Sequence, residues 1–236
     1  MKKVSCIICA YNEEPRIGDV LKVVINHPLL DEIIVVDDGS IDNTSREALE
    51  FKGIKIIRHK KNLGKSCSML DGCNNVKNDV IMFLDADLDG LTHDNITQLV
   101  KPVLAGLVDM TMVICKYNFP QNVLIKLVGY DLISGQRVIR REMAIKILKN
   151  IPGYAAEIGI NQYILDNNLK FIVVKWLNVR PIVQRKKKGI VKAVLNTIIG
   201  FRQLLIMLSL TQIIKQLLFM GKLSAKYKKE LNIEEK

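Results

Sequence analysis

Short runs of β-branched and apolar residues alternate with amphipathic stretches over the first 115 residues of the chain. Runs that are apolar on both faces are typical of parallel strands covered on two sides, and helical periodicity is typical of the helices that cover them. The pattern predicts a three-layer α/β/α fold with a mostly parallel sheet. The expected strands are Val4–Ala10, Glu32–Val36, Ile54–Arg58, Val80–Leu84 and Met110–Cys115, and the expected helices are Arg16–Ile25, Thr44–Phe51, Lys65–Val76 and His93–Leu104.

The pattern changes from about Pro120 onward, but the chain shows no internal repeat and no low-complexity linker. We therefore expect one domain over residues 1–189, in which residues 116–189 continue the fold begun by residues 1–115. The expected elements are a loop and short strand at Ser134–Ile139 that lead into a helix, a second helix at Tyr154–Asp166 and a further strand at Phe171–Leu177.

The remaining residues, 190–236, are basic and contain an apolar stretch, Ile190–Leu223, that predicts a helical extension. Its longest charge-free run, Gln203–Ile214, has 12 residues, whereas a helix that spans a bilayer needs roughly 20 apolar ones. We therefore expect no membrane crossing. Two placements stay open: the apolar face lies in a membrane interface as a peripheral contact, or it packs on the domain core or on the second subunit of a homodimer.

Positive charge is concentrated in the C-terminal half of the chain. The net charge of +11 divides into 14 Lys and Arg against 17 Asp and Glu in residues 1–118, and 21 against 7 in residues 119–236, or −3 and +14. This asymmetry favours an anionic partner, which is a phospholipid surface, a phosphorylated acceptor or nucleic acid. No recognised nucleic-acid motif accompanies the charge, so nucleic acid is the least favoured. The alternative is a solvated face that keeps the protein soluble.

The five cysteines indicate a reducing compartment. They form no zinc-like pair of pairs, and the CxxC of Cys6 and Cys9 lies inside an apolar strand rather than at the strand-to-helix turn that a redox motif needs. The first residues lead straight into a strand with no signal-peptide pattern. We therefore expect reduced core cysteines in a cytoplasmic protein, at the inner face of the membrane if the extension is interfacial.

Polar motifs follow four of the expected strands, at the edge of a parallel sheet where ligands bind. They are Tyr11-Asn12-Glu13-Glu14, Asp37-Asp38-Gly39-Ser40, Asn62-Leu63-Gly64-Lys65 and Asp85-Ala86-Asp87. The last motif supplies two carboxylates one residue apart, and hard cations such as Mg²⁺ or Mn²⁺ take carboxylate oxygens together with substrate phosphates. We therefore predict that Asp85 and Asp87 hold a divalent cation, against the alternative that they cap a turn.

The second and third motifs have two interpretations each. Asp38 can accept a hydrogen bond from a base or ribose beside the Gly39 turn, or the motif is an Asx turn ahead of the helix near Thr44. Gly64 and Lys65 offer a turn and a cation at a helix start, where backbone N–H groups favour anions, or Lys65 is simply solvated. The Gly-x-Gly-x-x-Gly and P-loop patterns are both absent from the sequence, which argues against dinucleotide-binding and P-loop proteins.

In this order and at these intervals, the four motifs resemble the nucleotide-sugar-binding half of glycosyltransferase family 2, over residues 1–115. The resemblance implies a GT-A type fold and a nucleoside diphosphate sugar as donor. It also implies a set of site residues: Asp85, Ala86 and Asp87 at the metal and the diphosphate, Lys65 beside the nucleoside, and Tyr11, Glu13 and Asp38 in contact with it.

The second half resembles glucosyl-3-phosphoglycerate synthases and their relatives, in motifs at Ser134–Arg137, Arg140–Glu142 and Gly153–Gly159. On this resemblance residues 116–189 are the acceptor half, and Gly135 and Arg137 bind a hydroxyl acceptor that is anionic or lipid-linked. Glu157 becomes the candidate for acceptor binding or for the general base. The alternatives are that Glu157 is a solvated acid in the first turn of a helix and that Arg137 pairs with a surface acid.

One departure concerns the metal. Related enzymes complete the site with a His after the last strand, but Asn178–Val183 contains none, and the chain's only histidines are His27, His59 and His93. The resemblance therefore leaves the third metal ligand open.

The sequence predicts a metal-dependent glycosyltransferase that moves a sugar from a nucleoside diphosphate to an acceptor hydroxyl, with inversion or retention left open. One alternative is a non-catalytic sugar-nucleotide-binding or membrane-associated scaffold, which the missing His favours. A sugar-nucleotide-forming nucleotidyltransferase would need a Gly-rich basic loop after the first strand, where Tyr11-Asn12-Glu13-Glu14 is acidic. A nucleic-acid-binding protein is the third alternative.

Overall fold

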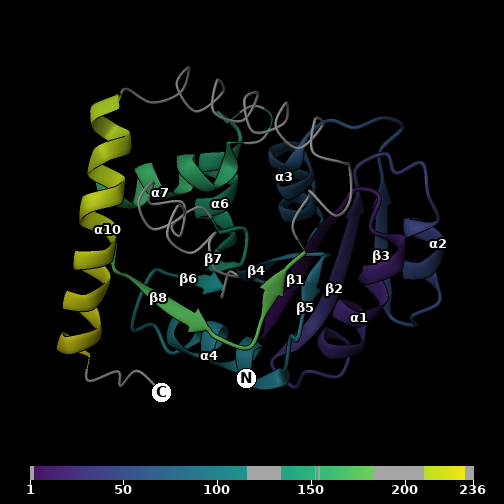
Figure 1. Ribbon diagram of the computed structural model, residues 1–236, viewed down its shortest axis with the longest axis horizontal. Coiled ribbons are helices and arrows are strands. Elements are labelled where there is room, and N and C mark those ends of the chain that lie inside the picture. The colour runs from purple at the N-terminus through teal and green to yellow at the C-terminus, as the bar shows by residue number, and fades with distance from the viewer. Residues whose placement is uncertain (1–2, 116–133, 152, 154, 183–209, 232–236) are drawn as a thin grey trace.

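The computed structural model describes residues 3–115, 134–151, 153, 155–182 and 210–231. Within them, seven strands form one sheet and two short strands pair with each other (Figure 1). The strands are β1 (Val4–Ala10), β2 (Leu30–Asp37), β3 (Ile54–Arg58), β4 (Val80–Asp85), β5 (Leu88–Asp89), β6 (Met110–Cys115), β7 (Arg137–Arg140), β8 (Phe171–Trp176) and β9 (Arg180–Pro181). The helices are α1 (Glu14–Val24), α2 (Thr44–Leu49), α3 (Lys65–Asn75), α4 (His93–Leu104), α6 (Arg141–Leu148), α7 (Ala156–Asp166) and α10 (Leu210–Glu230).

Helices cover both faces of the sheet, which gives the three layers that the sequence predicts (Figure 1). α3, α6 and α7 lie on one face, and α1 and α4 lie on the other. Successive residues of β1 alternate between two hydrophobic clusters: Cys6 packs on the α1 and α4 side, and Ile7 packs on the α3, α6 and α7 side. Burial on both faces is the reason why the strands are continuous apolar runs in the sequence.

The same alternation separates the two cysteines of the CxxC. Cys6 packs in one cluster and Cys9 packs against the other, so their side chains point to opposite faces of the sheet. All five cysteines are free thiols, and burial raises the pKa of Cys6 and of Cys9. Two thiols on opposite faces cannot form one redox or metal site, which agrees with the prediction of reduced core cysteines.

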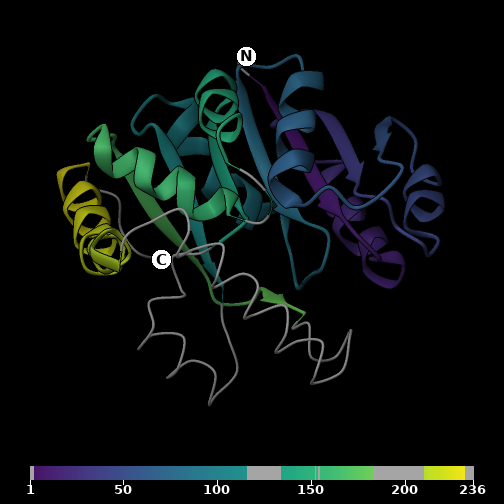
Figure 2. The ribbon, with the colours of Figure 1, turned by 90° about the horizontal axis from the view of Figure 1, so that it is seen from above.

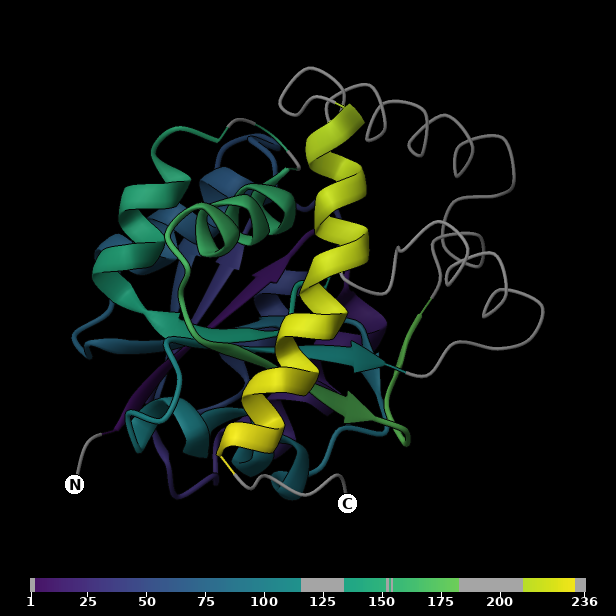
Figure 3. The ribbon, with the colours of Figure 1, turned by 90° about the vertical axis from the view of Figure 1, so that its left-hand side faces the viewer.

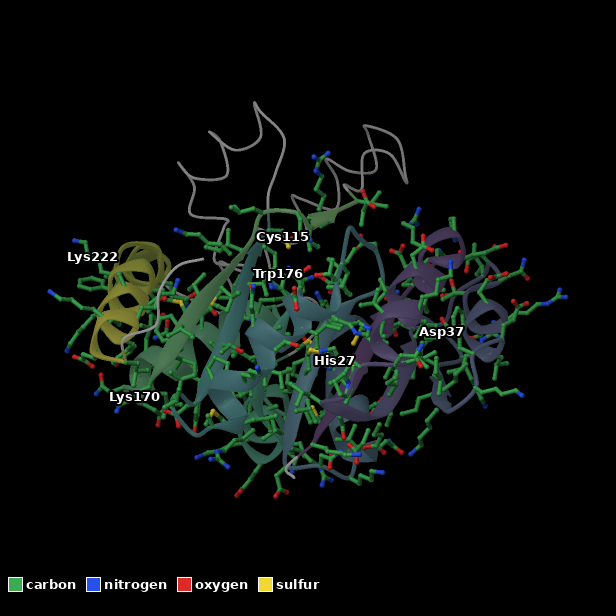
Figure 4. The ribbon with its side chains drawn as sticks, turned by 90° about the horizontal axis from the view of Figure 1, so that it is seen from below. His27, Asp37, Cys115, Lys170, Trp176 and Lys222 are labelled. Carbon is green, nitrogen blue, oxygen red and sulfur yellow. The ribbon has the colours of Figure 1, made fainter. Side chains whose placement is uncertain are left out.

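One reversed strand brings the second half of the chain to the ligand-binding edge. The sheet order is β3-β2-β1-β4-β7-β6-β8, and β7 runs antiparallel to β4 and β6, whereas the other pairings are parallel. Because Arg137 pairs with Phe83, the residues just before Arg137 lie beside the end of β4. The carboxyl ends of the parallel strands and the start of β7 therefore share one edge. Figure 4 shows Cys115 and Trp176, the last residues of β6 and β8, at that edge.

Most of the expected elements are confirmed, with ends that differ by a few residues. The pairing of β5 with β9 was not predicted, because strands of two residues carry no periodicity. The helix expected at Tyr154–Asp166 begins at Ala156, and Tyr154 lies outside the described residues. So do residues 116–133 of the expected acceptor half and residues 183–209, which include the start of the extension.

α10 packs across β8, the edge strand of the sheet, at the opposite end from β3 (Figures 2 and 3). Met220 is buried against the core, and the ring of Tyr227 meets Phe171 edge to face, with centroids 6.2 Å apart. The hydroxyl of Ser224 accepts the backbone N–H of Val173 at 2.8 Å. An edge strand has unpaired backbone groups that favour aggregation, and α10 covers this edge and bonds to it.

This packing decides the placement of the described part of the extension. The inward side chains of α10 are used on the protein's own core rather than in a membrane interface. Among the helices that the structure describes, each is too short or too polar to span a bilayer. Residues 190–209 of the extension lie outside the described part of the chain.

We expect Ser224→Ala to lower the free energy of unfolding by about 1–3 kcal/mol, the cost of leaving a buried backbone N–H without its acceptor. Urea unfolding measures this. Lys222→Ala, on the exposed side of the same helix, is the matched control and should stay within about 0.5 kcal/mol of the wild type. Equal stabilities of the two variants would show that Ser224 does not protect the strand edge.

Candidate functional site

The loops after β1 and β2 are joined by hydrogen bonds. Asn12 adopts a φ of 57°, and its N–H donates to Ser40 Oγ at 2.9 Å. The N–H of Glu13 donates to Thr44 Oγ1 at 2.8 Å. The loop that carries Tyr11 and Glu13 is therefore fixed against the loop that follows Asp38. Contact of Tyr11 and Glu13 with a nucleoside stays a prediction.

Asp38 organises the loop that follows β3. Its Oδ1 accepts the N–H of Leu63 at 2.8 Å, its Oδ2 accepts the N–H of Gly64 at 2.9 Å, and its side chain is 6% exposed. His59 Nδ1 also lies 2.8 Å from Asp38 Oδ1. Both carboxylate oxygens thus have partners in the protein, so Asp38 shapes this loop whichever ligand binds. Its expected contact with the nucleoside remains a prediction.

His59 is a residue that the sequence motifs did not single out. Its Nε2 lies 3.0 Å from Asp71 Oδ2, so the ring bridges Asp71 on α3 and Asp38 at the end of β2. A single His at a strand end carries no distinguishing pattern, and only the fold reveals the bridge. A hollow of about 400 Å³ opens beside it, lined by Gly39, Ser40, Ile41, Arg58, His59 and Lys60.

Lys65 lies between two carboxylates from different parts of the chain. Gly64, with φ of 93°, turns the backbone into α3, and Lys65 Nζ then lies 2.6 Å from Asp85 Oδ1 and 2.7 Å from Glu157 Oε1. Burial alone would lower the pKa of Lys65, but the two carboxylates outweigh burial and raise it above its usual range. The structure thus brings together three of the predicted site residues and excludes a solvated Lys65.

Gln136 is the second donor to Asp85 and was not predicted as a site residue. Its Nε2 donates to Asp85 Oδ2 at 2.6 Å, and its Oε1 accepts the hydroxyl of Ser134 at 2.7 Å. Gln136 and Ser134 are both buried. The available signal was their position directly before a strand, but it becomes informative only when that strand is known to be antiparallel.

Contact of Arg137 with the acceptor stays a prediction, but the structure shows that this side chain already has partners within the protein. Its side chain is fully buried, Nε donates to the carbonyl of Ser134 at 2.7 Å, and Nη1 donates to Asn161 Oδ1 at 2.7 Å. Burial lowers the pKa of this guanidinium to about 10, although Glu157 and Asp85 act in the opposite direction. Because β7 is a central strand, its first side chain points into the core between β7 and α7. Arg137 therefore supports the site from beneath.

Gly135 lies so close to the Lys65–Asp85 ion pair that there is no room for a side chain at this position. A Cβ at this position would lie 2.4 Å from Lys65 Nζ and 2.6 Å from Asp85 Oδ1. The contact of Gly135 with an acceptor stays a prediction, and its lack of a side chain is already required by the ion pair.

The predicted cation site consists of Asp85 and Asp87 at the end of β4, with Ala86 buried between them. No group of three His, Cys, Asp or Glu side chains within the described ranges is arranged to hold a metal ion. Two carboxylates are nevertheless sufficient for Mg²⁺, which completes its octahedron with substrate phosphates and waters. The residues present therefore fit a cation whose coordination a donor diphosphate completes.

The segment where related enzymes were expected to carry a His does run beside this motif. The N–H of Ile182 donates to the carbonyl of Asp87 at 3.2 Å, because β9 pairs with β5. Asn178, at the start of this segment, donates instead to the carbonyl of Gly90 at 2.9 Å. The segment Asn178–Val183 thus runs beside the predicted cation site, as the resemblance implies, but it contains no histidine.

We expect Gly135→Ala to lower the free energy of unfolding by about 1–3 kcal/mol, because Lys65 and Asp85 must move away from the added Cβ. The matched control is Gly18→Ala inside α1, where the Cβ would meet Phe51 at an ordinary 3.7 Å. That change should stabilise the protein by about 0.5–1 kcal/mol. Urea unfolding compares them, and two variants of equal stability would contradict the close approach at Gly135.

Curated relatives match part of this chain. Dolichyl-phosphate beta-glucosyltransferase ALG5A of Trichomonas vaginalis is 31% identical over 97 residues, which cover 36% of this chain and 30% of the relative. Dolichol-phosphate mannosyltransferase of Pyrococcus furiosus is 37% identical over 91 residues, or 36% of this chain and 26% of the relative. Undecaprenyl-phosphate 4-deoxy-4-formamido-L-arabinose transferase of Edwardsiella ictaluri is 34% identical over 112 residues, which cover 44% of this chain and 34% of the relative. The chain spans about a third of the length of these relatives.

Solved structures share the fold. Glucosyl-3-phosphoglycerate synthase from Mycobacterium tuberculosis, in complex with Mn²⁺, UDP-glucose and phosphoglyceric acid, gives a TM-score of 0.64 at 21% identity, over 77% of this chain and 72% of that chain. The same enzyme in complex with Mg²⁺ and UDP gives 0.64 at 21% identity, with the same coverage. Identity this low shows the fold alone, and it confirms the GT-A type fold.

The family model described as glycosyl transferase family 2 matches residues 5–158. This range is more than half of the chain and runs from β1 to the first turn of α7. It therefore includes all four strand-end motifs, the start of β7 and Glu157. The chain belongs to glycosyltransferase family 2.

Proposed function

We propose that this protein transfers a glycosyl group from a nucleoside diphosphate sugar to an acceptor hydroxyl, with Mg²⁺ or Mn²⁺ at Asp85 and Asp87. The observation that supports this most is the Lys65 ammonium between Asp85 and Glu157, at the carboxyl edge of the sheet. Ligands of open α/β sheets bind at this edge, and these three charged side chains meet there, partly or fully buried. Family membership supports the same reaction class.

The reaction exchanges one bond for another at the anomeric carbon of the sugar. The bond to the diphosphate oxygen breaks, the acceptor oxygen forms the new bond, and the hydroxyl proton passes to a base. A bound cation would supply positive charge to the departing diphosphate. Lys65 adds a second positive charge, and an ammonium has three N–H donors, so Lys65 can keep both carboxylates and still donate to a phosphate oxygen.

Glu157 is our candidate for contact with the acceptor hydroxyl or for the base. It is the second residue of α7, is buried, and is oriented by Lys65 at 2.7 Å. Because the side chain of Glu157 is buried, it is not a solvated acid in the first turn of the helix, which was the alternative interpretation. A buried carboxylate fixed by an ammonium is well placed to accept a hydrogen bond from a hydroxyl that enters the site.

The acceptor that we propose is a hydroxyl compound that also carries an anionic group, and it is either lipid-linked or a small phosphorylated molecule. Relatives are named for dolichyl phosphate, dolichol phosphate and undecaprenyl phosphate. The net charge of +14 on residues 119–236 supports an anionic acceptor. Which acceptor binds is determined by the shape of the acceptor pocket rather than by a sequence motif.

We also propose that the protein is cytoplasmic and contacts the inner face of the membrane peripherally, through the lysine face of α10. This face consists of Phe219, Lys222, Lys226 and Lys229, which are spaced along one side of the helix and exposed. Figure 4 shows Lys222 on the side of α10 that is turned away from the sheet. Lysines beside one exposed aromatic ring fit an anionic lipid surface.

The first test is calorimetric titration of a panel of nucleoside diphosphate sugars, with and without Mn²⁺. We expect one donor to bind tightly with Mn²⁺, and Mn²⁺ alone to bind weakly because the protein supplies only two carboxylates. Asp85→Asn and Asp87→Asn should each weaken the Mn²⁺-linked binding by at least about tenfold.

Asp89→Asn is the matched control for this titration, because Asp89 lies two residues further along and is exposed, and it should bind as the wild type does. Donor binding without nucleotide release in the presence of acceptors would favour the non-catalytic scaffold. No binding of any donor would remove the glycosyltransferase proposal.

The second test is flotation with phosphatidylglycerol vesicles. Each lysine near an anionic surface contributes about 1 kcal/mol, so Lys222→Glu/Lys226→Glu/Lys229→Glu should abolish binding that the wild type shows at low salt. The control reverses three exposed lysines of the first half, Lys22, Lys52 and Lys101, and should float with the vesicles. Equal flotation of both triple variants would contradict the lysine face as the contact.

A further inference from the structure

Asp85 receives one hydrogen bond on each carboxylate oxygen, from opposite sides of the site. Lys65 Nζ lies 2.6 Å from Oδ1, and Gln136 Nε2 lies 2.6 Å from Oδ2. A carboxylate has about four lone-pair positions, so two donors leave it able to accept further ligands. They also remove its freedom to rotate about the bond to the Cβ atom. Lys65 alone would fix one oxygen and leave the plane of the carboxylate free.

The amide of Gln136 is itself oriented by a neighbour. The Ser134 hydroxyl donates to Gln136 Oε1 at 2.7 Å, which leaves the NH₂ end toward Asp85. The reverse orientation would direct Oε1 at a carboxylate oxygen, acceptor against acceptor. Both side chains are buried, where such a mismatch is costly. The structure therefore specifies which end of the amide meets Asp85.

The backbone that carries this pair is fixed from below. Arg137 Nε donates to the carbonyl of Ser134 at 2.7 Å, and Arg137 Nη1 donates to Asn161 Oδ1 at 2.7 Å. Asn161 lies four residues after Glu157 on α7, so the same helix face contacts Lys65 through Glu157 and Arg137 through Asn161. The polar contacts thus form a closed ring from α7 through β7, β4 and α3 back to α7.

We propose that Gln136 is a positioning residue, which fixes the orientation of the Asp85 carboxylate for the donor and its cation, with Ser134 fixing the amide of Gln136. This inference rests on the proposed function, because it assigns Asp85 to the cation. It differs from a direct role for Gln136, whose Nε2 meets Asp85 and whose Oε1 meets the Ser134 hydroxyl. Groups that orient a metal ligand commonly change metal affinity by about 10–100-fold when they are removed.

Two substitutions distinguish positioning from direct ligation. Gln136→Met removes the donor with little change of volume. Gln136→Glu introduces a carboxylate, which repels Asp85 if Gln136 acts through Asp85 but strengthens cation binding if Gln136 is itself a ligand. Gln98→Glu, on the exposed surface of α4, is the matched control for the added charge.

The measurement is calorimetric affinity for the donor that the wild type prefers, with and without Mn²⁺, together with urea unfolding of each variant. The ratio of the two affinities reports the coupling between donor and cation. We expect Gln136→Met and Gln136→Glu to reduce this ratio by about tenfold, with metal-free affinity within about twofold of the wild type. Gln98→Glu should leave both unchanged.

Several outcomes would overturn the assignment. An unchanged ratio in both variants, or a ratio that rises in Gln136→Glu, would show that Gln136 does not act through Asp85. Equal losses with and without Mn²⁺ would indicate a general structural role instead. A wild type without Mn²⁺-linked donor binding would overturn the proposed function and this inference together, whereas a normal wild type with unchanged Gln136 variants would overturn only the inference.

Discussion

The ion pair of Lys65 with Asp85 and Glu157 is the interaction on which the rest of the site depends. Two carboxylates close together repel each other, and the buried Glu157 is also costly to remove from water. The Lys65 ammonium, within 2.7 Å of both, offsets the repulsion and the cost of burying Glu157. Removing one member of such a group leaves the others without compensation. The surrounding elements must therefore hold three side chains from α3, β4 and α7 at one point, and Gly135 must have no side chain.

The antiparallel strand β7 is what allows those elements to meet. With a parallel β7, Gln136 and Gly135 would lie at the far edge of the sheet, and α7 would follow from the wrong end. The reversal places residues before Arg137 next to Asp85, and the buried Arg137 then connects this strand to α7 through Asn161. The fully buried guanidinium lies among Glu157 and Asp85, whose charges counter the effect of burial on its pKa. The buried Arg137 and Glu157 and the partly exposed Lys65 and Asp85 thus share the space between the halves of the chain.

The sequence predicted the parallel strands and the four strand-end motifs because each is a local pattern: an apolar run, then polar residues at a turn. It predicted Lys65, Asp85 and Glu157 one by one but not their contact, since they lie far apart in the chain. The direction of β7 is a tertiary property with no periodic signal, so Gln136 was missed, and for Arg137 the sequence offered acceptor binding or pairing with a surface acid rather than burial. Asp38 shows the same limit, because its partners His59, Leu63 and Gly64 depend on how the following loop folds back.

The absence of a suitable histidine has a physical consequence for the proposed cation. The chain's three histidines have other surroundings: the rings of His27 and His93 lie edge to face, 5.1 Å apart, and His59 bridges Asp38 and Asp71. The segment that runs beside Asp87, Asn178–Val183, contains no histidine. Because the protein supplies only two carboxylates to the proposed cation, oxygens of the donor and of water must fill the remaining coordination positions. Each ligand then raises the affinity for the other by the same factor. The orientation of Asp85, and hence the donors Lys65 and Gln136, matters more here than in a site with a third protein ligand.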